Sequence, residues 1–80
     1  MTVHASQYLD LRGLDPPDPM RRALEAIEAL IPGSTLDVVT DRDPQLLHRE
    51  LERRHYTYTR EIRHDGCHTL VGRRAGRDQP

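Results

Sequence analysis

The fold is decided by the stretch YLDLRGLDPPDPMRRALEAIEALIPGSTLDVVT, residues 8–40. Leu9 and Leu11 alternate with polar neighbours, which predicts a short strand over residues 8–11. Three prolines at positions 16, 17 and 19 exclude a regular strand there and indicate a rigid turn that precedes a helix. Residues 35–40 are typical of a second strand, with Leu36 and Val38 facing the core. A strand, a helix and a strand in this order predict a right-handed crossover between parallel strands.

The helix in the middle of this stretch has a continuous apolar stripe. Its members recur at helical spacing: Met20, Ala23, Leu24, Ile27, Leu30 and Ile31. Asp18 followed by Pro19 predicts an N-cap with proline at the first helical position. Asp15 is an alternative start, because Asp15 and Asp18 have the spacing of a capping box. Pro32 and Gly33 then end a helix of about fourteen residues.

The remaining chain predicts one more helix and two more strands. Asp43-Pro44 repeats the pattern of an N-cap followed by proline, and the helix after it extends to about residue 55, with Leu47 and Leu51 inward. Residues 56–63 and 67–73 read as strands joined by a two-residue Asp65-Gly66 turn. The predicted order is βαβαββ. This is an α/β chain of the α+β two-layer sandwich type, with two helices on one face of a four-stranded mixed sheet.

Length and composition restrict the class of protein. The 80 residues allow one domain, which we place at residues 8–74, between a flexible N-terminus of residues 1–7 and a disordered tail of residues 75–80. The net charge of −1 does not favour nucleic acid as a partner. No apolar run is long enough to span a membrane, and the composition of residues 1–7 leads us to expect no signal peptide. With one cysteine and no possible intramolecular disulfide, a cytoplasmic location is expected.

The single cysteine, Cys67, could have one of two roles. The Asp65-Gly66 turn would pair His64 with Cys67 and Ile62 with Thr69, which places Cys67 at the rim of the helix-covered face. A structural role is favoured there. The alternative is a reactive thiol, which His64 could activate.

Other side chains that could form sites favour ordinary structural roles. The five histidines, His4, His48, His55, His64 and His68, are predicted to be surface residues too dispersed to share a metal ion. No metal and no cofactor are therefore expected. Asp15 and Asp18 are expected to cap the helix rather than to form a catalytic pair. Val39 and Leu70 are predicted to project from the helix-free face, where they could seed an apolar patch for a partner.

Two sequence motifs, and the order in which they occur, resemble those of the TusA-like (SirA-like) family of small sulfur carriers. The first, Gly-Leu-x-Cys-Pro-x-Pro, corresponds to residues 13–19, and the second, Pro-Gly-x-x-Leu-x-Val followed by Asp-Pro, corresponds to residues 32–38 and 43–44. The resemblance implies the same fold, but Pro16 stands at the cysteine position. Because proline has no nucleophile, the chain is most similar to the cysteine-lacking branch, a domain of unknown function.

The resemblance implies a non-catalytic binding or adaptor module in bacterial sulfur, redox or respiratory metabolism. Its expected partner is another protein, with neither nucleic acid nor membrane involved and the oligomeric state left open. The predicted binding residues are the entry to the first helix and its first turn: Gly13, Leu14, Asp15, Pro16, Pro17, Asp18, Pro19, Arg21 and Arg22. The first turn is also a candidate anion site. The alternative function is a divergent sulfur carrier that uses Cys67.

Overall fold

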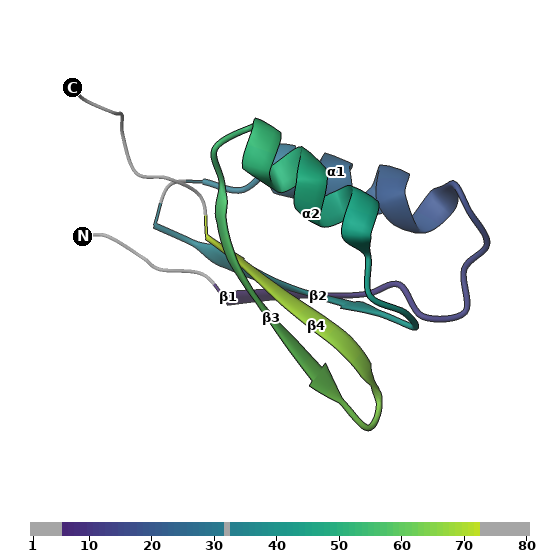
Figure 1. Ribbon diagram of the computed structural model, residues 1–80. Coiled ribbons are helices and arrows are strands. Elements are labelled where there is room, and N and C mark those ends of the chain that lie inside the picture. Colours follow the sequence, from purple (N-terminus) through teal and green to yellow (C-terminus); the bar gives the residue numbers. More distant parts are fainter. Residues whose placement is uncertain (1–5, 32, 73–80) are drawn as a thin grey trace.

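The computed structural model describes residues 6–31 and 33–72, and these form two layers (Figure 1). The elements follow in the order β1 (Ser6–Asp10), α1 (Asp18–Glu28), β2 (Thr35–Thr40), α2 (Gln45–Arg53), β3 (Thr57–Arg63) and β4 (Gly66–Gly72). The sheet has the strand order β1-β2-β4-β3. Strands β1 and β2 are parallel, and the other two pairings are antiparallel. The predicted α+β architecture with a mixed four-stranded sheet is confirmed.

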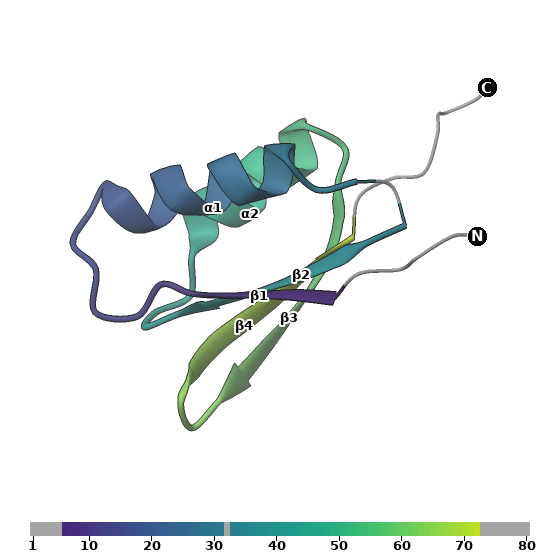
Figure 2. The same cartoon turned by 180° about the vertical axis from the view of Figure 1, so that it is seen from behind.

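Both helices cover the same face of the sheet, as the two opposite views show (Figures 1 and 2). The core between the layers consists of nine buried side chains: Leu11, Ala23, Ile27, Leu30, Leu36, Val38, Leu47, Leu51 and Val71. They come from the apolar stripes of both helices and from alternate positions of the strands, as the two periodicities require. The described strands therefore have one helix-covered face and one face without helices.

Helix α1 differs from its predicted limits at both ends. Pro17 is the N-cap and no side chain caps the helix, so Asp18 is the first helical residue. The Asp18 N–H instead donates to the Asp15 carbonyl at 3.0 Å, which closes a turn before the helix. At the other end α1 stops at Glu28, and the chain turns so that Leu30 is buried. Ile31 is 56% exposed, so its predicted place in the core stripe is wrong.

Helix α2 begins after Pro44, not after Asp43 as predicted, and again no side chain caps it. It ends at Arg53, two residues before the predicted limit. His55 has a left-handed backbone with φ of 64°. The His55 and Tyr56 N–H groups donate to the carbonyls of Glu52 and Leu51, which is the Schellman arrangement that closes a helix. The predicted burial of Leu47 and Leu51 is confirmed.

The β3–β4 hairpin has a different register from the predicted one. Arg63 pairs with Gly66 and Ile62 with Cys67, so the two turn residues are His64 and Asp65. Gly66 has a φ of 142°, and a Cβ atom there would lie 2.5 Å from the Thr40 carbonyl oxygen, so this close approach needs glycine. The register differs by two residues. Side chains consequently keep their predicted faces, because strand side chains alternate with a period of two.

The ends of the chain were predicted to be flexible. Strand β1 begins at Ser6, where it pairs with Thr35, so residues 6 and 7 are part of the sheet. Residues 1–5 and the predicted tail of residues 75–80 lie outside the described part of the chain. Within residues 6–31 and 33–72, neither helix has the length and apolar content that crossing a bilayer requires.

Candidate functional site

A groove of about 630 Å³ lies where the two helices begin. One wall is formed by the segment between β1 and α1 together with the first turn of α1, and it contributes Leu14, Pro16, Pro17 and Pro19. These four belong to the binding residues predicted from the sequence, and the structure brings them together on one surface. Prolines and leucines present apolar area that is fixed in shape, because the proline ring restricts its own backbone. The wall is therefore suited to contact with an apolar surface.

The second wall comes from the segment between β2 and α2 and from the residues that flank it, and the sequence reasoning missed it. It runs from Thr40, the last residue of β2, to Leu47 in the first turn of α2, and it includes Pro44 and Leu46, of which Leu46 is 66% exposed. The two walls are joined by one hydrogen bond, from the Gly13 N–H to the Asp41 carboxylate at 2.7 Å. A signal for this wall was present in the sequence. Parallel strands end at the same edge of a sheet, so the segments that follow β1 and β2 must be neighbours.

The other predicted binding residues do not line the groove. Arg21 pairs with the carboxylates of Asp18 and Glu25 on the outer surface of α1, at 3.3 and 3.2 Å. Its guanidinium is therefore engaged within the helix and is not directed to a ligand at the helix start. Asp15 and Arg22 are exposed outside the groove.

Cys67 lies outside the groove, on the helix-covered face of β4. Its side chain is buried, with 2% of the residue exposed, and burial raises the pKa of the thiol. A raised pKa keeps the sulfur protonated at neutral pH, which disfavours nucleophilic attack. His64, the residue that could activate the thiol, is on the exposed turn. The structural reading of Cys67 agrees with this environment.

Two histidines predicted to be surface residues are buried. His48 donates to or accepts from the Thr69 hydroxyl at 2.9 Å, and its ring stacks on Tyr58 with centroids 4.7 Å apart. Burial lowers the pKa of His48, so the ring is neutral near pH 7, and Asp43 lies 3.5 Å away, beyond an ordinary hydrogen bond. His68 is buried on the other face. Within the described parts of the chain, no three His, Cys, Asp or Glu side chains are arranged to hold a metal ion.

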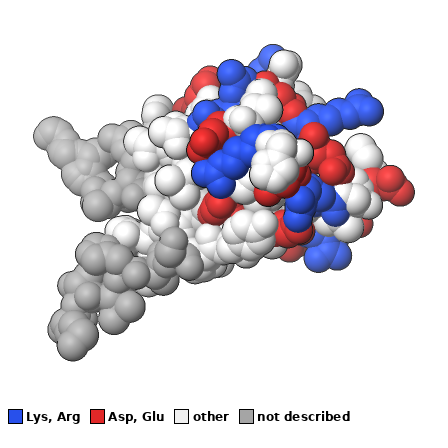
Figure 3. All heavy atoms as spheres, turned by 90° about the horizontal axis from the view of Figure 1, so that it is seen from below, with Lys and Arg blue, Asp and Glu red and all other residues white. Residues whose placement is uncertain are grey.

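The helix-free face carries mixed charges, and the predicted apolar patch is wrong for one of its two members (Figure 3). Leu70 is 46% exposed, but Val39 is completely buried although no helix covers it. In the sheet Val39 lies between Asp10 on β1 and His68 on β4, which both carry polar side chains on this face. Sequence periodicity assigned Val39 to the correct face but could not show which side chains distant in sequence flank it there.

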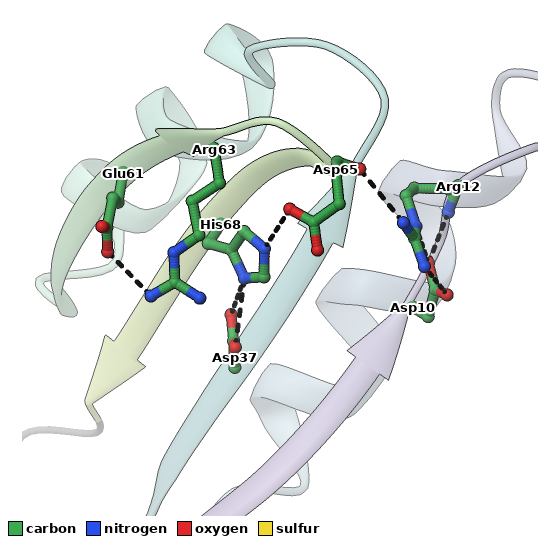
Figure 4. Close-up of polar contacts among 7 residues, drawn as sticks. All are labelled: Asp10, Arg12, Asp37, Glu61, Arg63, Asp65 and His68. Atoms are coloured by element: carbon green, nitrogen blue, oxygen red, sulfur yellow. Dashed lines mark hydrogen bonds and ion pairs between the residues drawn. The ribbon is translucent and has the colours of Figure 1, made fainter.

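Those polar side chains form a connected cluster (Figure 4). Arg12 makes two hydrogen bonds through its guanidinium to Asp10, at 2.8 and 2.7 Å, and this pairing lowers the pKa of Asp10 to about 2. Arg12 also donates to the carbonyl of Asp65 in the hairpin turn at 3.1 Å. His68 lies between the carboxylates of Asp37 and Asp65. The cluster thus connects three strands and the hairpin turn.

These observations define the class of protein: a two-layer α+β domain with an apolar groove where its two helices begin and with its thiol buried elsewhere. Within that class, the chain belongs to the family described as uncharacterized conserved protein (DUF2249), which matches residues 8–73. No curated protein and no solved structure matches the chain.

Proposed function

We propose that this domain is a non-catalytic binding module and that the groove between the β1–α1 and β2–α2 segments is the surface that contacts a partner protein. The observation that carries the proposal is the lining of the groove. It consists mainly of leucines, prolines and a methionine, with Thr40, Asp41, Arg42, Asp43 and Gln45 as its polar members, and it contains no Cys, Ser, His or Lys. The Thr40 hydroxyl donates to the Arg42 carbonyl at 2.7 Å. Such a surface can bury the apolar side chains of a partner, whereas nucleophilic chemistry needs an activated nucleophile.

The resemblance to the TusA-like family supports the same proposal. Pro16, the residue at the cysteine position of that family, lies in the groove wall. In such carriers the thiol at this position holds the sulfur, and a chain with proline there retains the surface without the chemistry. On this resemblance, the proposed setting is bacterial sulfur, redox or respiratory metabolism in the cytoplasm.

The alternative, a sulfur carrier that uses Cys67, has less support. A carrier thiol must be reached by both a donor and an acceptor, and Cys67 is 2% exposed with a raised pKa. Intact-mass analysis after incubation with a cysteine desulfurase and cysteine separates the two functions. We expect no adduct of one sulfur atom under conditions that load a TusA-like protein. An adduct that disappears in Cys67→Ser would contradict the non-catalytic proposal.

The contact surface itself is tested with a photocrosslinking amino acid at position 46. Leu46 lies on the groove rim and is 66% exposed, whereas Ile31, which is 56% exposed, is not among the residues that line the groove and provides a matched control. We expect a protein from the native host to be trapped at position 46 and not at position 31. Its purified form should bind wild-type chain, and Leu46→Glu should weaken that binding more than Ile31→Glu. Equal effects of the two substitutions would exclude the groove as the contact surface.

A further inference from the structure

His68 has an unusual position between two acidic side chains (Figure 4). Its Nδ1 lies 3.3 Å from both carboxylate oxygens of Asp37 on β2, and its Nε2 lies 3.0 Å from Asp65 Oδ1 in the hairpin turn. Ionised carboxylates only accept hydrogen bonds. A neutral imidazole has one N–H to donate, and an imidazolium has two. Both contacts are therefore satisfied together only when the ring is protonated.

The charges around the ring lead to the same conclusion. Asp37 and Asp65 contact the ring, whereas Asp10 and Glu61 lie farther away and are each paired with an arginine (Figure 4). Arg12 pairs with Asp10 at 2.7 Å and Arg63 pairs with Glu61 at 2.8 Å. Both arginines also attract Asp65, and Arg63 attracts Asp37, but among the described residues the cation within salt-bridge distance of Asp37 and Asp65 is His68. When the ring loses a proton, one carboxylate faces a ring lone pair and the attraction between the ring and both carboxylates is lost.

The hairpin turn is the part of this cluster that can move. Asp37 is fixed in β2, which pairs on both sides, whereas Asp65 lies beyond the last pair of the hairpin, Arg63 with Gly66. The turn also contacts one residue next to or within each of the two segments that form the groove. The Asp65 carbonyl accepts from Arg12, the residue before Gly13, and Gly66 is packed closely against the backbone of Thr40.

We propose that His68 is a proton-dependent clamp that holds the 64–66 turn against the sheet when its ring is charged and loosens the turn when the ring is neutral. Because Arg12 and Thr40 contact the turn, the same proton changes the conformation of the two segments that form the groove. The clamp consists of residues of this chain alone and does not depend on which partner occupies the groove.

The electrostatics of the two partners agree with this arrangement. The contacts with Asp65 and Asp37 raise the pKa of His68, although Arg63 opposes the increase, and the contact with His68 lowers the pKa of Asp65. The transition is therefore expected above the pH at which an ordinary exposed histidine titrates, about 6.5.

The experiment is an NMR titration of the uniformly labelled full chain from about pH 5 to about pH 9, the range in which histidine changes charge. We expect the His68 ring to titrate above the value of about 6.5 that histidine has in an unfolded peptide. The backbone amides of Gly66, Arg12 and Gly13 should follow the His68 curve. A His68 midpoint at or below that value would overturn the proposal, and so would amides that do not follow it.

Two variants and one control substitution separate the clamp from a general effect of pH. Asp65→Asn removes one of the two charges, so it should shift the His68 midpoint to lower pH. Asp15→Asn, an exposed carboxylate outside the cluster, should leave it unchanged. His68→Gln imitates the neutral ring, and it should show the alkaline positions of the Gly66 and Arg12 amides already at low pH. Acidic-form amide positions in His68→Gln would refute the clamp, even if the groove binds a partner.

Discussion

The left-handed backbone of His55 provides a direct test of how helix α2 is closed. A residue with a side chain pays about 1–2 kcal/mol of folding free energy to adopt this left-handed conformation, whereas glycine adopts it without that cost. Glycine also loses more backbone entropy on folding, roughly 0.5–1 kcal/mol. His55→Gly is therefore expected to stabilise the domain by about 0.5–1 kcal/mol, the difference of the two terms. For a domain of this size, that gain corresponds to an increase in Tm of about 2–8 °C.

The assay is urea unfolding followed by circular dichroism, with the wild type and both variants compared at the same pH. Arg53→Gly is the matched control, because Arg53 is exposed and is the last residue of α2. Glycine there should destabilise the domain by up to about 1 kcal/mol. The reasoning is refuted if both substitutions destabilise the protein, because His55 would then not carry the backbone strain assigned to it.

Three further predictions concern the turn, the polar cluster and the groove. Gly66→Ala should destabilise the domain by roughly 1–3 kcal/mol in urea unfolding, because the added Cβ would meet the Thr40 carbonyl. The loss should be larger than that of Gly13→Ala, because no atom lies close to the position of a Cβ at residue 13. The stabilisation from His68 should be complete below about pH 6.5 and decrease as pH rises through its raised pKa. The stabilisation from Asp65 should be complete above about pH 4 and decrease as pH falls below it. Equilibrium unfolding should therefore show the greatest stability between about pH 4 and about pH 6.5. The double variant Pro16→Cys, Cys67→Ser should react with iodoacetamide at least about tenfold faster than the wild-type protein reacts at Cys67, because position 16 is exposed and near the start of α1. Equal rates would contradict the burial of Cys67.

The element order could be predicted from the sequence because it depends on periodicity. The apolar stripe of α1 and the alternation in the strands place Ile27, Leu36 and Val71 in the core without any knowledge of long-range contacts. The helix limits were less predictable. Asp18 and Asp43 have the usual sequence context of an N-cap, yet neither caps, and the Asp18 N–H closes a turn with Asp15. Local hydrogen bonds that compete with capping are not visible in a residue pattern.

For a related reason, only one of the two walls of the candidate site could be predicted from the sequence. The β1–α1 wall was found because its prolines are conspicuous in the sequence. The β2–α2 wall has weaker sequence features, and it becomes part of the site only because parallel strands place the two segments together. The burial of Val39 and His68 depends in the same way on pairing across the sheet, between residues up to 53 positions apart, as in the contact of Arg12 with Asp65.

The separation of the groove from the thiol has a consequence for function. In a carrier with a thiol at a helix start, the reactive atom and the partner surface occupy the same place. Here position 16 contributes a proline to the groove, while Cys67 is buried under the helix layer with a raised pKa. A carrier role for Cys67 would first require this side chain to become exposed, whereas Pro16 and Leu46 in the groove are already exposed. This difference supports the proposal that the domain acts by binding rather than by sulfur transfer.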